Sequence, residues 1–337
     1  MDCPTRRGIR TVPYVRRASL RRLRRRRRGR TAGVVLTGTV VLGSLGLTAC
    51  GTSATPSGGP TTGATSGRVI DVVAAEDFWG SIAAQLGGDH VQVVSIITNP
   101  NTDPHAYEPT AADARTLAGA QLVIENGIGY DPWVPRLLAA DGGNRTTLDV
   151  GTLLGVPVGG NPHRWYDPAD VQAVVHALAG DFASLDPTDR SYFDQQEVRF
   201  TTVDLQPYDA TISAIKARYS GTPIGASESV VAMMAPALGL DLVTPPTFLK
   251  AVSEGIDVSA ADKQAIDSQI RTRQIRIYVY NSQNVTPDIQ VQLNEVRAAH
   301  IPVATITETL QPVGATFQAW QTRQLLGIQA ALARADG

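Results

Sequence analysis

The chain has 337 residues, 43% of them hydrophobic and 18% charged, which is more than one compact domain usually holds. Its formal net charge of −1 conceals an asymmetry, because the first 50 residues hold 13 of the 30 basic residues and only one acidic residue. Residues 51–337 therefore carry about −13, which argues against nucleic-acid binding and favours attraction of cations. Cys3 and Cys50 are the only cysteines, so we expect no disulfide framework and metal binding through nitrogen and oxygen alone.

The N-terminal segment is predicted to be a signal peptide rather than part of a fold. After the arginine-rich stretch, residues 31–47 are apolar and small, shorter than the roughly 20 residues of a membrane span. They end in Leu-Thr-Ala-Cys-Gly at residues 47–51, which resembles the bacterial lipobox and implies lipidation of Cys50. A basic nucleic-acid arm is the alternative for the arginines alone. Arg16 and Arg17 leave Sec and twin-arginine export both open.

Residues 51–68 are rich in glycine, serine and threonine and contain no large apolar residue, so we predict a flexible tether. A tether behind a lipidated Cys50 would hold a globular part at the outer face of the cell membrane.

The next segment alternates strand-like and helix-like patterns, which is typical of a parallel sheet covered on both faces. We predict a first α/β lobe at residues 69–186. Its strands are expected at 69–73, 91–97 and 122–124, and its helices at 77–86, about 110–118, from 131 onward, and about 168–185.

Residues 187–219 contain no glycine, and Pro207 is their only internal helix breaker. Apolar residues recur at roughly helical spacing, while Val198 falls off that stripe. The stripe consists of Phe193, Phe200, Val203, Tyr208, Ile212 and Ile215. We predict a long linking helix at 187–220 with a break near Pro207.

The alternation then resumes, which predicts a second α/β lobe at residues 221–337. Its strands are expected at 223–226, 240–243, 275–280 and 302–306, and its helices at 230–238, 259–271, 287–299 and 317–333. The predicted fold class is therefore α/β, with two lobes of mainly parallel sheets flanked by helices and joined by a long linking helix. We expect a monomer.

Two histidines occur in the same local context. His105 lies in TDPHAYEP and His163 in NPHRWYDP, so each follows a proline and precedes an aromatic residue, an acid and a second proline. Proline fixes φ and pushes the preceding residue out of the helical region, so we expect stiff, extended loops. Either loop alone is typical of a surface turn, but the pair indicates half of a metal site.

Two glutamates follow predicted strands of the second lobe. Glu228 in SES comes directly after strand 223–226, and Glu308 in TET comes directly after strand 302–306. Ligands of open parallel sheets bind beyond the carboxyl ends of the strands. Such glutamates are also common as helix caps. Beside the two histidines, however, they predict a site closed between the lobes.

These motifs resemble the metal-binding solute receptors of ABC transporters, the zinc- and manganese-binding family with two α/β lobes joined by a long helix. The resemblance extends over the whole chain after the tether and includes VVAAEDFWGSIAAQLGG and ENGIGYDPW. It implies that His105, His163, Glu228 and Glu308 bind Zn²⁺ or Mn²⁺ as transported ligand, and that an ABC permease is the partner. Many relatives have an aspartate where this chain has Glu308, and many zinc members carry a histidine-rich loop that this chain lacks. The choice of metal therefore stays open.

An exported zinc-dependent hydrolase and a surface adhesin are the alternatives. The hydrolase is disfavoured because the sequence has no pair of histidines four residues apart, and we predict that the protein is not an enzyme. The other histidines, His90, His176 and His300, are expected to have core or surface roles.

Further polar residues are candidates for orienting the ligands, although turn or capping roles are the simpler interpretation: Asp103, Glu108, Asp167 and Asn281. Trp133, Trp165 and Tyr166 are expected to pack the lobes, and Glu254 and Asp257 to lie in a solvated loop.

Overall fold

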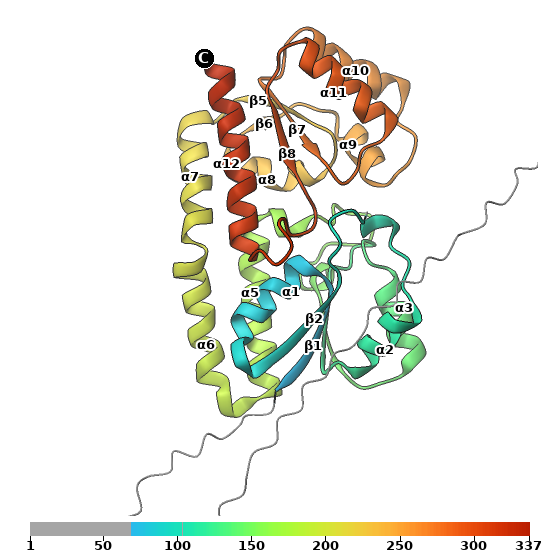
Figure 1. The fold of residues 1–337 in the computed structure, drawn as a ribbon, viewed down its shortest axis with the longest axis vertical. Coiled ribbons are helices and arrows are strands. Elements are labelled where there is room, and N and C mark those ends of the chain that lie inside the picture. The colour runs from blue at the N-terminus through green and yellow to red at the C-terminus, as the bar shows by residue number, and fades with distance from the viewer. Residues whose placement is uncertain (1–68, 103) are drawn as a thin grey trace, which may run out of the picture. The chain divides into compact units, whose positions relative to one another are not determined.

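The computed structural model describes residues 69–102 and 104–337, which form two α/β lobes (Figure 1). The predicted signal peptide, Cys50 and the tether lie outside these residues, and so does Asp103. Within the described part of the chain, no helix is both long and apolar enough to cross a bilayer.

The first lobe is built on a parallel sheet of four strands in the order β2-β1-β3-β4. The strands are β1 (Ile70–Glu76), β2 (Val91–Ile97), β3 (Leu122–Glu125) and β4 (Thr146–Asp149). The helices are α1 (Asp77–Gly87), α2 (Ala111–Gly119), α3 (Trp133–Asp141), α4 (Val150–Leu154) and α5 (Pro168–Leu185), with short 3₁₀ turns η1 (Gly88–His90), η2 (Pro104–Ala106) and η3 (Arg164–Tyr166).

The central strand β1 is apolar on both faces because both are covered. Val72 and Ala74 belong to the main core with α1 and α5, whereas Val73 and Ala75 pack in a second cluster with residues of α2 and α3. Adjacent residues of a strand point to opposite faces, so a continuous apolar run is what a doubly covered sheet requires. Figure 1 shows α1 and α5 on one side of this sheet and α2 and α3 on the other.

The second lobe repeats the architecture with strand order β6-β5-β7-β8, again parallel. Its strands are β5 (Pro223–Ala226), β6 (Asp241–Leu242), β7 (Ile277–Asn281) and β8 (Val303–Ile306). Its helices are α8 (Val230–Leu238), α9 (Pro246–Ser253), α10 (Ala260–Arg271), α11 (Pro287–Ala298) and α12 (Phe317–Asp336).

A helical segment joins the lobes. It begins with the turn η4 (Pro187–Asp189) and continues as α6 (Arg190–Arg199), the π-helical turn η5 (Phe200–Asp204) and α7 (Gln206–Tyr219). The break falls just before Pro207, because the amide of Leu205 bonds to the carbonyl of Phe200 five residues earlier, at 2.9 Å. Helix α6 packs against α5, and α7 packs against α8 and α12 (Figure 1).

The predicted fold class is confirmed, and three local expectations were wrong. Val203 was placed on the buried stripe but is 60% exposed, because the π turn adds a residue and shifts the helical phase. The loops of His105 and His163 are not extended, since η2 contains His105 and η3 begins after His163. Strand β4 and helices α4 and α9 were not predicted.

Candidate metal centre

The four predicted ligand residues lie in segments that follow strands or in short helical turns and the residues before them. His105 lies in η2, after β2, and His163 directly precedes η3. Glu228 follows β5, and Glu308 follows β8. Because all strands of each sheet are parallel, the segments of His105, Glu228 and Glu308 leave the carboxyl edges of the two sheets, where ligands of such folds bind, whereas the segment of His163 follows α4.

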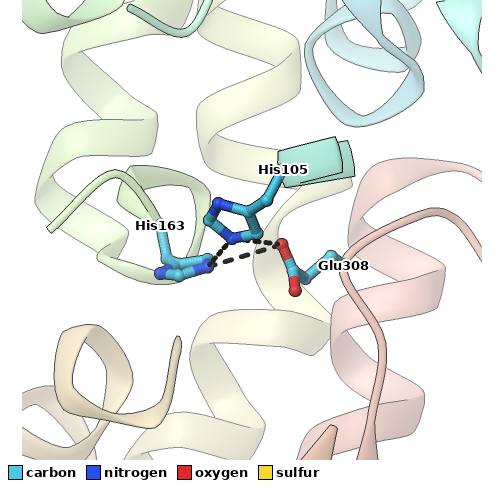
Figure 2. A group of neighbouring side chains, drawn as sticks. All are labelled: His105, His163 and Glu308. Atoms are coloured by element: carbon cyan, nitrogen blue, oxygen red, sulfur yellow. Dashed lines mark hydrogen bonds and ion pairs between the residues drawn. The ribbon is translucent and has the colours of Figure 1, made fainter. Parts of the chain in front are cut away.

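Three of the four side chains meet (Figure 2). Nε2 of His105 lies 3.4 Å from Nε2 of His163 and 3.5 Å from Oε2 of Glu308, and Nε2 of His163 lies 3.4 Å from the same oxygen. The three atoms thus form a nearly equilateral triangle. Its centre is about 2.0 Å from each atom, which matches the bond lengths of Zn²⁺ to histidine nitrogen and carboxylate oxygen. The spacing of the three atoms is therefore that of ligands around one transition-metal ion.

His163 is fully buried, and its ring orientation is determined by Asn161. Nδ1 of His163 donates to Oδ1 of Asn161 at 2.8 Å, and the backbone amide of His163 donates to the same oxygen at 3.1 Å. The amide of Asn161 in turn donates to the carbonyl of Ser229 in the second lobe, at 2.8 Å. A proton on Nδ1 leaves the Nε2 lone pair directed at the triangle, which is how metal-binding histidines are commonly oriented.

Glu308 is held from both lobes. Its Oε2 accepts a hydrogen bond from the hydroxyl of Tyr130 at 2.7 Å, and its Oε1 accepts one from the side-chain amide of Asn281 at 2.6 Å. The backbone amides of Glu308 and Thr309 both donate to the side chain of Gln283. This carboxylate therefore has little freedom to turn away from the imidazoles.

Glu228 lies outside the triangle. Its Oε1 accepts from the same amide nitrogen of Asn281 that binds Glu308, and its Oε2 accepts from Asn284 at 2.9 Å. Asn281 therefore bridges the two carboxylates. Glu228 would reach an ion in the triangle only by exchanging an amide partner for the metal.

The protonation states of the buried Glu228, Glu308 and His163 depend on burial and on one another. Burial, followed by the nearby charge of Glu308, raises the pKa of Glu228 to about 8. Burial would also raise the pKa of Glu308, but the adjacent His105 and His163 hold it well below its usual range. Burial lowers the pKa of His163, which favours the neutral imidazole that a metal requires.

A cavity of about 420 Å³ leads to His105. It is lined by residues of both lobes, including Tyr130, Asn161, Ser229 and Lys250. His105 has 18% of its side chain exposed, whereas Glu308 has 1%. An ion entering through this cavity would meet His105 first.

Of the other residues singled out from the sequence, Glu108 is exposed and Asp167 caps α5 by accepting from the amide of Ala169. Trp165 stacks on Phe78 at a centroid distance of 3.9 Å within the core. Tyr166 joins the lobes, because its hydroxyl donates to the carbonyl of Thr307 at 2.7 Å.

Sequence reasoning missed the roles of Tyr130 and Asn161. The sequence around Tyr130 did hold a signal. Tyr130 follows β3 after two glycines, Gly127 and Gly129, and both adopt positive φ. The segment between them is strained, because Ile128 is β-branched and has a φ of 62°. Asn161 precedes the proline in NPHRWYDP. An asparagine at this position is common in ordinary turns, so only the structure reveals its contact with His163.

Solved structures share this fold. The periplasmic zinc-binding protein TroA from Treponema pallidum matches with a TM-score of 0.65 and 19% identity, over 78% of this chain and 99% of that protein. A cadmium-bound periplasmic metal-binding protein from Candidatus Liberibacter asiaticus matches with a TM-score of 0.63 and 17% identity, over 78% and 99%. The chain thus shares its fold with these structures.

The family model of the zinc-uptake complex component A, periplasmic (ZnuA), matches residues 72–331, and the chain belongs to this family. Among curated relatives, the manganese-binding lipoprotein MntA of Halalkalibacterium halodurans is 25% identical over 182 residues, 47% of this chain and 59% of the relative. The manganese ABC transporter substrate-binding lipoprotein PsaA of Streptococcus pneumoniae serotype 4 is 27% identical over 156 residues, 41% and 48%. The chain thus spans about half the length of the curated relatives it matches.

Proposed function

We propose that the protein is an extracytoplasmic receptor that captures Zn²⁺ or Mn²⁺ between its lobes and delivers the ion to an ABC-type permease. The observation that carries this proposal is the triangle of His105, His163 and Glu308, whose edges of 3.4 to 3.5 Å match a single coordinated ion. Membership of a metal-uptake family supports it.

Glu228 is proposed as the fourth ligand. It is buried beside the triangle and linked to Glu308 through Asn281, and its raised pKa means that it holds a proton near neutral pH in the metal-free protein. A dication would lower that pKa, expel the proton and draw the carboxylate in. Two imidazoles with two carboxylates suit zinc and also admit manganese.

We propose capture rather than hydrolysis, and a binding protein without enzymatic activity, because the chain belongs to a metal-uptake family and its sequence has no pair of histidines four residues apart. No observation favours the adhesin.

Delivery is proposed to follow separation of the lobes. His105 and His163 belong to the first lobe and Glu308 to the second, so separation would leave neither half with a complete ligand set. We propose lobes at 69–186 and 221–337 with a linking segment at 187–220. Lipidation of Cys50 would keep the receptor beside the permease, and Cys50→Ser is expected to release the protein from the membrane fraction.

Calorimetric titration of Zn²⁺ and Mn²⁺ tests the proposal. Glu308→Ala and Glu228→Ala should each weaken binding by at least tenfold, about 1.4 kcal/mol. Glu254→Ala is the matched control, because Glu254 lies at the rim of the cavity and pairs only with Lys250 among the described residues. The proposed ligand set fails if Glu308→Ala binds as tightly as the parent protein does.

A further inference from the structure

A second cluster of metal-ligating residues lies in the first lobe. His90 ends η1, directly before the amino end of β2, while Asp186 precedes and Asp189 ends the turn η4 between α5 and α6. His105 follows the opposite, carboxyl end of β2. Seven residues of strand span about 23 Å, so this cluster is separate from the centre described above.

One atom from each of these three side chains lies within 4.8 Å of the other two. Nδ1 of His90 is 2.8 Å from Oδ2 of Asp189. The imidazole ring is held in place by α6, because it packs against Tyr192 at a centroid distance of 4.2 Å and against the edge of Phe193 at 5.7 Å. The ring is thus oriented toward the carboxylates before any ion arrives.

Asp186 is the member of the cluster that points most directly to a ligand. The residue is 8% exposed, and its Oδ1 accepts hydrogen bonds from the hydroxyl and amide of Thr188, which lower the pKa of this carboxyl. Its Oδ2 is buried, yet it accepts no hydrogen bond from any residue that the structure describes. Burying a carboxylate oxygen without a partner is costly, and a bound dication would satisfy it.

We propose that His90, Asp186 and Asp189 form a second binding site for a divalent transition-metal ion such as Zn²⁺ or Mn²⁺. One imidazole nitrogen and two carboxylate oxygens suit these ions, and three protein ligands leave room for water. The side chains of His90 and Asp189 are 27% and 29% exposed, so this site binds more weakly than the buried centre. It ties the end of α1 to the turn between α5 and α6, so its expected effect is stabilisation of the first lobe.

The test is a calorimetric titration of zinc into the purified protein and into three variants. The parent should bind two ions per chain, and Asp186→Asn and His90→Gln should each lose the weaker one while the tighter one is unchanged. Asparagine keeps the Oδ1 that caps Thr188 and replaces only the oxygen without a partner. His176→Gln is the control, because His176 pairs with a single carboxylate, Glu197, at 2.9 Å and should keep both ions.

The result does not depend on the receptor proposal, because the Glu308→Ala protein should still bind the weaker ion and gain thermal stability from it. If Asp186→Asn folds poorly, the number of ions bound is compared between His90→Gln and the parent. The proposal is overturned if the parent binds one ion only, or if the weaker ion persists in both variants. Zinc-edge anomalous diffraction from zinc-soaked crystals should show a peak beside Nδ1 of His90, and a peak only elsewhere would also overturn it.

Discussion

The hydroxyl of Tyr130 donates a hydrogen bond to Oε2 of Glu308 at 2.7 Å, although the two residues are 178 positions apart and belong to different lobes. The same oxygen faces Nε2 of both His105 and His163. Tyr130 therefore holds the carboxylate of the second lobe against the imidazoles of the first.

Tyr130→Phe is expected to weaken zinc binding by about tenfold, because groups that orient metal ligands contribute that much. The phenyl ring would keep its edge contact with His105, at a centroid distance of 4.6 Å, so only the hydroxyl is tested. Tyr107→Phe is the control, since it removes a hydroxyl bound to Asp113 in the first lobe. Equal affinities of the parent and Tyr130→Phe would show that the hydrogen bond does not support the site.

Asn281→Asp should destabilise the metal-free protein. The amide nitrogen of Asn281 donates to both Glu228 and Glu308, and an aspartate would replace this shared donor by a third buried acceptor. We expect a loss of about 2 kcal/mol or more in the free energy of unfolding, partly recovered when zinc is added. Thermal melts with and without zinc measure both effects. Asn99→Asp, at an exposed position, should melt like the parent, and an unchanged melt for Asn281→Asp would contradict the bridging role.

Glu125→Gln should change how stability depends on pH. Glu125 ends β3, and burial, followed by the charges of Asp131 and Asp149, raises its pKa from 4.5 to about 8. The folded protein keeps a proton that the unfolded chain releases above about pH 4.5, so this group costs stability as the pH rises from there to about 8.

Glutamine cannot ionise, so the variant should gain stability over the parent mainly toward pH 8, by about 1 kcal/mol or more. Urea unfolding at pH 5 and pH 8.5 measures the difference. Glu108→Gln removes an exposed acid and should show no such trend. A difference that is the same at both pH values would refute the proposed cause.

Lys250→Ala should accelerate metal exchange. Nζ of Lys250 in the second lobe donates to the carbonyl of Gly159 in the first, at 3.1 Å, and both residues line the cavity above His105. The lysine side chain is 56% exposed, so its loss should change the melting temperature little. Stopped-flow release of zinc to a chelator should be several-fold faster than in the parent. Lys263→Ala, which removes a partly exposed lysine of α10, should leave the rate unchanged, and equal rates for Lys250→Ala would exclude a closing role for the contact of Lys250 with Gly159.

Local patterns in the sequence were sufficient for the architecture. Buried strands such as β1 appear as continuous apolar runs because helices cover both faces, and glycines mark several helix ends. The location of the candidate site could be predicted by the same reasoning, because the parallel topology brings all strand carboxyl ends to one edge of each sheet. Glu228 and Glu308 could be singled out in advance from this edge, and His105 and His163 from their shared proline-flanked context, while the role of all four as ligands stays a prediction.

Local patterns failed where neighbouring elements decide the outcome. Val203 is exposed because one π turn shifts the phase of the helical segment, and the helices on either side of that turn, α6 and α7, pack against different lobes. Strand β4 is short and only partly apolar, so its pairing with β3 identifies it better than its own composition does.

The sequence by itself determined the two-lobed α/β fold, the paired histidine loops and the strand-end acids, because these depend on residues close together in the chain. Only the tertiary structure decided that Glu308 completes a triangle with the two imidazoles while Glu228 is held aside by Asn281 and Asn284. It alone revealed Tyr130 beside Glu308 and His90 beside two aspartates. The physical reason is that a metal site requires agreement within a few tenths of an ångström, and distances between the side chains of different segments follow from packing rather than from spacing along the chain.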